Sequence, residues 1–146
     1  MKRLTIFAIL LPLLVAACKR GGKPPEITVG TTTCAADQRV IDDVSLAAVA
    51  RSSDGTVKAF DSAACLLRTI PGGDEWHVWF HDHESANWIE APKAVFVIQR
   101  EGAGGPVRHI PAFVDRKQAD AFYERTPGRN EIAPDYSTLR SVMSHE

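Results

Sequence analysis

Residues 57–70 read VKAFDSAACLLRTI, and this stretch decides the fold because its pattern occurs twice in the chain. The second copy is IPAFVDRKQADAFYERTPG, at 110–128. Each copy has an Ala-Phe pair that ends a strand-like stretch, then an acidic or hydroxyl residue suited to capping a helix, then an Ala-rich helical run. Phe60 and Phe113 lie 53 positions apart. The sequence therefore predicts two units of about fifty residues.

The segments that flank each copy complete a unit of the order strand, strand, helix, strand. Apolar stretches bounded by turn residues predict strands at 39–52, 55–60, 75–82, 93–101, 107–113 and 130–134. The second helix is expected at 116–125, with Asp115 as its N-cap. A three-stranded sheet with one helix can hardly bury both its faces alone. We therefore expect an α+β fold in which two similar strand-strand-helix-strand units pack together in one compact domain.

The N-terminal residues MKRLTIFAILLPLLVAAC have the layout of an export signal. Lys2 and Arg3 form a positive start, residues 4–14 form an apolar run, and small residues precede Cys18. The apolar run is too short for a membrane span and fits the hydrophobic part of a signal peptide. The three features in this order resemble bacterial lipoprotein signals, in which the cysteine is lipidated and becomes the mature N-terminus. Lipidation is therefore expected at Cys18.

After the signal we expect a tether and then one domain of two units. The signal peptide is expected at 1–17 and the lipidated N-terminus with its linker at 18–30. The first unit is expected at 31–83, and the second unit with a short C-terminal tail at 84–146. The stretch KRGGKPP, 19–25, has the composition of a tether. Lys19 stands where an aspartate is the common signal for retention in the inner membrane. We therefore expect a periplasm-facing membrane lipoprotein, with the outer membrane favoured over the inner.

The composition argues against several classes of function. The chain carries 17 Lys and Arg against 18 Asp and Glu, and two of the basic residues belong to the signal, so the mature net charge is −3. No basic patch points to nucleic acid, and nothing after Cys18 is apolar for long enough to cross a membrane. The sequence contains no Ser/His/Asp elbow, phosphate loop or CxxC motif. An enzymatic function is therefore not expected.

Cys34 and Cys65 are the two thiols that remain once Cys18 is lipidated. An exported chain meets oxidising conditions, so one interpretation is a disulfide that closes a loop of about thirty residues. The other is a free, buried cysteine, because Cys65 lies in the apolar run DSAACLLRTI beside two leucines. The sequence leaves both interpretations open.

The order of several motifs resembles the NosL family, the accessory lipoproteins that handle copper for the maturation of nitrous-oxide reductase. The matching pieces are Cys34, FDSAACLL (60–67), VWFHD (78–82), WIEAPKAVFVI (88–98) and PAFVDRKQADAF (111–122). The resemblance implies a fold of two strand-strand-helix-strand units, in agreement with the repeat. It also implies a bound copper ion and a copper-enzyme client as partner.

The chain departs from this family at the residues that bind copper. Members carry a cysteine motif with methionine shortly after it, and here the corresponding stretch is CAADQRVI, 34–41. Asp37 stands where a second cysteine would fall, and Arg39 where methionine would. A later Met-Gly step is replaced by GPVRHIPAF, 105–113, and Met143 in the C-terminal tail is the one methionine of the mature chain. Because Cu(I) favours thiolate, thioether and imidazole, these losses remove the part of the site most specific for Cu(I).

The stretch WHVWFHDHES, 76–85, carries three histidines. On a strand, alternate side chains face opposite ways, so every second residue from Trp76 to Phe80 is expected in the core. His81 and His83 share the other face about 7 Å apart, and a metal there needs at least a third ligand. With the family resemblance, the candidate metal ligands are Cys34, His81, His83 and His109. The alternative is that His81 and His83 are solvated where the strand meets a loop.

Two functions from different classes follow. The first is an exported, lipid-anchored accessory protein that binds a metal ion, copper or else zinc, and delivers it to a partner enzyme. Its partners would be the lipid membrane, through acylated Cys18, and a copper-enzyme client. The alternative is a metal-free lipoprotein interaction module that kept the family scaffold and docks a partner protein. Cys34 and histidines around a common point favour the first, whereas scattered histidines and a Cys34–Cys65 disulfide favour the second.

Overall fold

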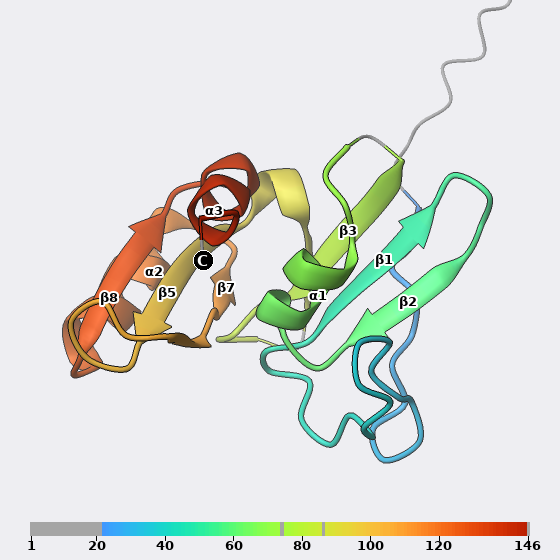
Figure 1. The fold of residues 1–146 in the computed structure, drawn as a ribbon, viewed down its shortest axis with the longest axis horizontal. Helices are drawn as coiled ribbons and strands as arrows, with labels where there is room; N and C mark the ends of the chain where they lie inside the picture. The colour runs from blue at the N-terminus through green and yellow to red at the C-terminus, as the bar shows by residue number, and fades with distance from the viewer. Residues whose placement is uncertain (1–21, 74, 86, 146) are drawn as a thin grey trace, which may run out of the picture.

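Two antiparallel sheets and three α-helices build the molecule (Figure 1). The computed structural model describes residues 22–73, 75–85 and 87–145. The expected signal peptide and the expected lipidation site, Cys18, therefore lie outside the described residues. The fold is α+β, as the sequence predicts.

The first sheet has the strand order β2-β1-β3-β4, and all its neighbouring strands are antiparallel. Its strands are β1 (Ala48–Ser52), β2 (Val57–Phe60), β3 (Trp76–His81) and β4 (Trp88–Glu90). At one end of the sheet Ala48 pairs with both Phe60 and Phe80, and at the other end Ser52 pairs with Trp76. The sheet thus has two distinct ends about 14 Å apart along β1.

The second sheet is centred on β5. Its strands are β5 (Val95–Arg100), β6 (Val107–His109), β7 (Ala112–Phe113) and β8 (Arg129–Ala133). β8 pairs along one edge of β5, while β6 and β7 pair with successive halves of the other edge. The strand expected at 107–113 is divided in two because Pro111 has no N–H to donate to the ladder. Its carbonyl still accepts from the N–H of Val97 at 3.1 Å.

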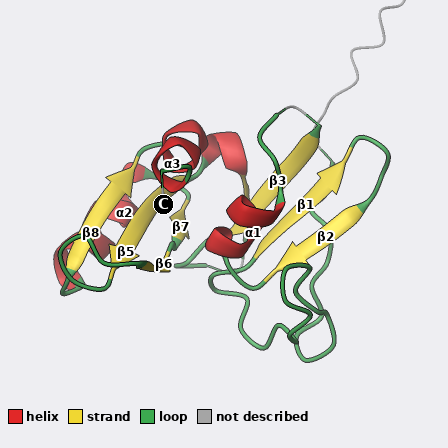
Figure 2. Cartoon of the chain, viewed as in Figure 1, coloured by secondary structure: helices red, strands yellow, loops and turns green. Residues whose placement is uncertain are grey.

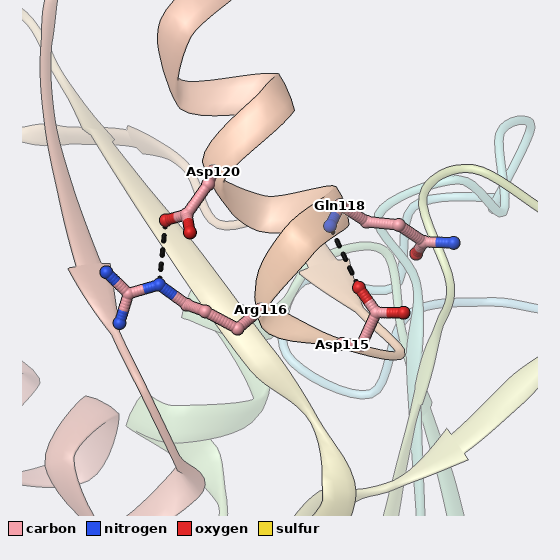
Figure 3. Close-up of polar contacts among 4 residues, drawn as sticks. All are labelled: Asp115, Arg116, Gln118 and Asp120. Carbon is pink, nitrogen blue, oxygen red and sulfur yellow. Dashed lines mark hydrogen bonds and ion pairs between the residues drawn. The ribbon is translucent and has the colours of Figure 1, made fainter.

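Side-chain caps start the three α-helices, α1 (Ala63–Thr69), α2 (Arg116–Arg125) and α3 (Tyr136–Met143). Each capping side chain accepts from the backbone N–H three residues on, and the caps are Ser62, Asp115 and Asp135. Figure 3 shows the cap of α2, where Asp115 accepts from the N–H of Gln118 at 2.9 Å and Arg116 pairs with Asp120 at 2.7 Å. A short 3-10 helix, η1 (Ala91–Lys93), joins the two sheets. Among the described residues, no helix is both long and apolar enough to span a bilayer.

The two units share one topology, so the sequence repeat is also a structural repeat. In each unit a central strand, β1 or β5, is flanked by the next strand in the chain and by the strand that follows the helix. Phe60 ends β2 and Phe113 ends β7, and both side chains are fully buried two positions before a helix cap. The predicted pair of strand-strand-helix-strand units is confirmed.

One apolar core joins the two units. The rings of Phe80 on β3 and Phe96 on β5 meet edge to face with their centroids 4.8 Å apart, and Tyr136 of α3 packs against both. α2 and α3 cover opposite faces of the second sheet (Figure 2). A smaller apolar cluster lies under α2 and consists of Val97, Phe113, Ala119 and Phe122. Both faces of the second sheet are therefore buried.

Three segments differ from the expectation. Residues 136–143, expected in a tail, form α3, whose Leu139 is fully buried. β4 falls in the range assigned to the second unit but pairs with β3 in the first sheet. β1 begins later than residue 39, because the side chain of Asp43 accepts from the N–H of Ser45 at 2.8 Å and turns the chain before the strand.

Residues 22–30, expected as a linker, lie against the first sheet on the face opposite α1 (Figure 1). Pro24 lines a hollow together with Trp79, whose side chain is 2% exposed. Ile27 packs against the main core, and the N–H of Gly30 donates to the carbonyl of Ile41 at 3.0 Å. This stretch is therefore part of the folded domain.

The two equivalent phenylalanines test the repeat. We expect Phe60→Ala and Phe113→Ala each to lower the free energy of unfolding by about 3–5 kcal/mol, because each leaves a cavity in a packed interior. The matched control is Tyr123→Ala on α2, because Tyr123 is 43% exposed. Its free energy of unfolding should change by no more than about 0.5 kcal/mol. Urea denaturation measures all three. A neutral effect at both phenylalanines would contradict their placement at equivalent positions in the packed core.

Candidate metal centre

A tight loop fixes Cys34 at one end of the first sheet. Its N–H donates to the carbonyl of Arg39 at 2.8 Å, and the N–H of Gln38 donates to the carbonyl of Cys34 at 2.8 Å. Gln38 turns the chain with a φ of 64°, a left-handed conformation that costs a non-glycine residue roughly 1–2 kcal/mol. The N–H of Ala35 also donates to the carbonyl of Ala59 on β2 at 2.8 Å. The loop is thus tied to the sheet, and Cys34 is fully buried.

The turn from β2 into α1 brings two further ligand atoms to the same end of the sheet. Asp61 follows the buried Phe60, and the hydroxyl of Ser62 accepts from the N–H of Cys65 at 3.3 Å. The Ser62 hydroxyl in turn donates to Oδ1 of Asp61 at 3.1 Å. Asp61 and Cys65 are both half-buried. The helix cap therefore fixes the positions of both side chains.

Cys34, Asp61 and Cys65 form what we call the thiol–carboxylate cluster. The Cys34 thiol donates to Oδ1 of Asp61 at 3.8 Å, and one ligand atom from each residue lies within 4.8 Å of the other two. A metal bonded to two thiolates at about 2.3 Å each holds sulphurs at most about 4.6 Å apart, so small side-chain shifts suffice to bind an ion. In the part of the chain that the structure describes, no other group of three or more His, Cys, Asp or Glu residues converges in this way.

The protonation of Cys65 links metal binding to pH. Burial raises the pKa of the Cys65 thiol, the hydrogen bond with Ser62 lowers it, and Asp61 and Cys34 raise it further. The thiol is therefore protonated near neutral pH, and a metal that binds the thiolate must displace a proton.

Cys34 and Cys65 are both free thiols in the structure. Of the two interpretations that the sequence leaves open, a disulfide or free cysteines, the structure presents the second, with the two sulphurs close together. In this form both sulphurs are available as metal ligands.

His81 and His83 occupy two different aromatic surroundings and do not belong to the thiol–carboxylate cluster. The His81 ring packs edge-on against Trp88 with centroids 5.3 Å apart. The His83 ring packs edge-on against Phe113 and Phe122 at 5.7 and 5.0 Å. Nδ1 of each histidine is buried and has no hydrogen-bond partner among the described residues. Both rings are thus packed side chains, half-buried rather than solvated.

His109 is exposed on β6, where it pairs with Gln99 of β5. The structure therefore brings Cys34 together with Asp61 and Cys65 and not with the three candidate histidines. Neither Asp61 nor Cys65 was predicted from the sequence as a metal ligand, since Cys65 was considered as a disulfide partner or as a free, buried cysteine. The available signal was the stretch FDSAAC, in which an aspartate before the helix cap and a cysteine four positions later fall on the same side of the first turn.

The fold and the cluster together define a two-unit α+β domain with a thiol-containing candidate metal site. The structure is similar to the crystal structure of the copper chaperone NosL from Shewanella denitrificans, with a TM-score of 0.59 and 22% sequence identity. The similarity covers 75% of this chain and 91% of that chain. No protein-family model and no curated protein sequence matches the chain. The chain therefore has a NosL-like fold, as the order of its motifs predicts.

The packing of His81 makes the stability of the fold dependent on pH. Burial lowers the pKa of His81, although Asp82 and Asp43 partly oppose the shift. As the pH falls through about 6.5, the unfolded chain takes up the proton first, so stability is present above this value and is lost below it. We expect a lower urea midpoint at about pH 5.5 than at about pH 7.5, and a smaller drop in His81→Gln.

The exposed His109 supplies the control for this measurement. His109→Gln should show the same drop in urea midpoint as the wild-type protein. If His81→Gln also retains the full drop, the burial of the His81 ring does not couple folding to pH.

Proposed function

We propose that the protein is an exported lipoprotein that binds copper as Cu(I) and passes it to a client enzyme. The observation that carries this proposal is the convergence of two thiols and a carboxylate in a fold similar to that of a copper chaperone. Cys34 lies 27 positions before Asp61 and 31 positions before Cys65, so the cluster is a product of the tertiary fold.

The ligand set suits a soft ion. Thiolates are preferred ligands of Cu(I), and Cys34 and Cys65 supply two of them in place of the missing methionines. Cys34 is fully buried in the main core, which keeps water away from its sulphur. Asp61 is a hard oxygen ligand, better matched to Zn(II), and it already accepts the Cys34 proton in a hydrogen bond.

Unequal burial of the two thiols suits transfer of the ion. Cys65 is half-buried and Cys34 has no exposed surface. A thiolate or imidazole of a client enzyme would reach the ion on the side of Cys65 and replace that ligand first. Cys34 would then be the last ligand to leave, so the ion passes by ligand exchange without being released to water.

The proposal locates this chemistry at a membrane surface. The sequence around Cys18 supports lipidation there, and Lys19 favours the outer membrane facing the periplasm. A copper-enzyme client in the same compartment completes the proposal, with a nitrous-oxide reductase as the client that the family resemblance suggests.

The cysteine pair provides the main test. With the purified lipidated protein in detergent under reducing conditions, we expect the protein to compete for Cu(I) with a chromogenic chelator. Cys34→Ser and Cys65→Ser should each weaken Cu(I) binding by about tenfold or more, since each removes one soft ligand. Because the Cys65 proton must leave, the apparent affinity should also rise with pH.

Matched variants separate the ligands. Asp61→Asn should weaken Zn(II) binding more than Cu(I) binding, because a carboxylate suits the harder ion. The double variant His81→Ala, His83→Ala and the single variant His109→Ala should leave Cu(I) binding unchanged. If the reduced wild-type protein takes up no metal, the copper proposal fails and the metal-free interaction module replaces it. Loss of Cu(I) binding in the histidine variants would instead support the histidine ligands expected from the sequence.

Lipidation is tested on the full chain in a bacterial host. The wild-type protein should carry a diacylglycerol thioether on Cys18, detected by mass spectrometry, and should fractionate with membranes. Cys18→Ala should give an unmodified precursor, whereas Cys34→Ser should remain lipidated. A wild-type protein that is soluble after fractionation would contradict the anchor.

A further inference from the structure

We infer that the end of the first sheet opposite the thiol–carboxylate cluster rests on the membrane, so that the cluster points away from the lipid. This inference rests on the proposed lipid anchor at Cys18 and goes beyond it by assigning an orientation and a contact surface. We call the two ends of the sheet the thiol end, at Phe60 and Asp61, and the entry end, at Ser52 and Trp76.

The described chain enters the fold at the entry end. Gly22 lines a hollow of about 570 Å³ together with Arg51, Ser53 and Trp76, and it also borders a second hollow that extends to Trp88. A Cβ added to Gly22 would lie 3.0 Å from the Arg51 guanidinium, which shows how closely the chain approaches β1 there. From this point the chain runs behind the first sheet to the loop at its other end (Figure 1).

The length of the tether limits where the lipid can be. Cys18 precedes Gly22 by four positions, and four extended residues span at most about 14 Å. A lipid on Cys18 therefore holds the entry end within about 14 Å of the bilayer surface. The thiol end lies about 14 Å further along β1, since Ala48 pairs with Phe60 there and Ser52 pairs with Trp76 at the entry end.

Trp76 and the nearby cations at the entry end suit a lipid headgroup region, whereas Trp79, 2% exposed, and Tyr136, packed on Phe80 and Phe96, form the floor of the hollow. Three aromatic rings line the hollow and each has a cation over it. The pairs are Arg51 over Trp79 at 5.6 Å, Lys58 over Trp76 at 5.3 Å, and Arg140 over Tyr136 at 5.6 Å. Tryptophan and tyrosine concentrate at membrane interfaces, and arginine and lysine attract anionic headgroups.

Two of these cations, Arg51 and Lys58, are the ones we assign to phosphate, because the Arg140 guanidinium already donates to the Tyr136 hydroxyl at 3.0 Å and to the Ile70 carbonyl at 3.2 Å. None of the three forms an ion pair with a carboxylate of the described residues. Glu75 is the carboxylate that lines the hollow, and it is exposed on the rim. His77, stacked on Trp79 at 4.1 Å, completes the polar lining. We therefore assign this surface to the phosphates and interfacial carbonyls of a phospholipid bilayer.

The native tryptophans report the orientation. Trp76 stands at the entry end, and Trp88 pairs with His81 about 17 Å further along β3. Two variants with one tryptophan each are compared, both containing Trp79→Phe, with Trp88→Phe in one and Trp76→Phe in the other. The lipidated protein is placed in phospholipid vesicles that carry a nitroxide-labelled headgroup. Trp76 should be quenched at least about twofold more than Trp88, because the two differ by this distance along the strand.

The outcomes separate orientation from function. Equal quenching, stronger quenching of Trp88, or no quenching in a lipidated protein would overturn the assigned surface. The same samples are tested for Cu(I) binding. If the quenching contradicts the orientation but Cu(I) still binds, the copper proposal stands. If Cu(I) does not bind but Trp76 is quenched more than Trp88, the orientation stands. If Trp79→Phe prevents folding, single Trp76→Phe and Trp88→Phe variants replace the pair, and the quenching of total fluorescence should fall only in the first.

Discussion

The edge-to-face contact between Phe80 and Phe96 is the interaction on which the rest of the structure depends. Each unit has one helix, and one helix cannot cover both faces of its sheet. Phe80 and Phe96 come from the strands β3 and β5 of different units, and Tyr136 packs over both rings, so the two units share one core together with α1 and α3. The N–H of His83 also donates to the carbonyl of Ala112 at 2.9 Å, a backbone link from the end of β3 to β7. An aromatic layer and a backbone link therefore hold the two sheets in one arrangement.

The repeat was predictable because its signals are local. An apolar residue two positions before a capping serine or aspartate marks the end of a strand and the start of a helix, and Phe60 and Phe113 both fit this pattern. The third helix was missed although Asp135 caps it in the same way. Its stretch YSTLRSVM is short and only weakly apolar, and no following strand marks its end. Its helical state depends on Leu139 and Tyr136, which pack into a core that the two units create together.

The candidate site was less predictable than the fold because its atoms meet only in three dimensions. His81 and His83 are close in sequence, which suggested a shared ion. The His81 ring instead packs against Trp88 of the first sheet, and the His83 ring against Phe113 of the second. The cluster that does converge depends on a hairpin loop bonded to β2 and on the cap of α1. No spacing rule within one element predicts such a contact, and only the aspartate and cysteine four positions apart gave a partial signal.

The rigid first sheet gives the proposed function a fixed geometry. Its strands join the entry end, where the chain begins its contact with the domain, to the thiol end, where Phe60 leads into Asp61. The hydrogen-bonded strands keep the two ends about 14 Å apart, so a contact of the entry end with the bilayer would set the position of the thiol end. At the thiol end Cys34 is buried, whereas Cys65 is half-buried and is the more accessible of the two sulphurs. Strand pairing thus joins the entry end to the thiol end within one sheet, and the second thiol of the cluster, Cys65, stands on the first turn of α1.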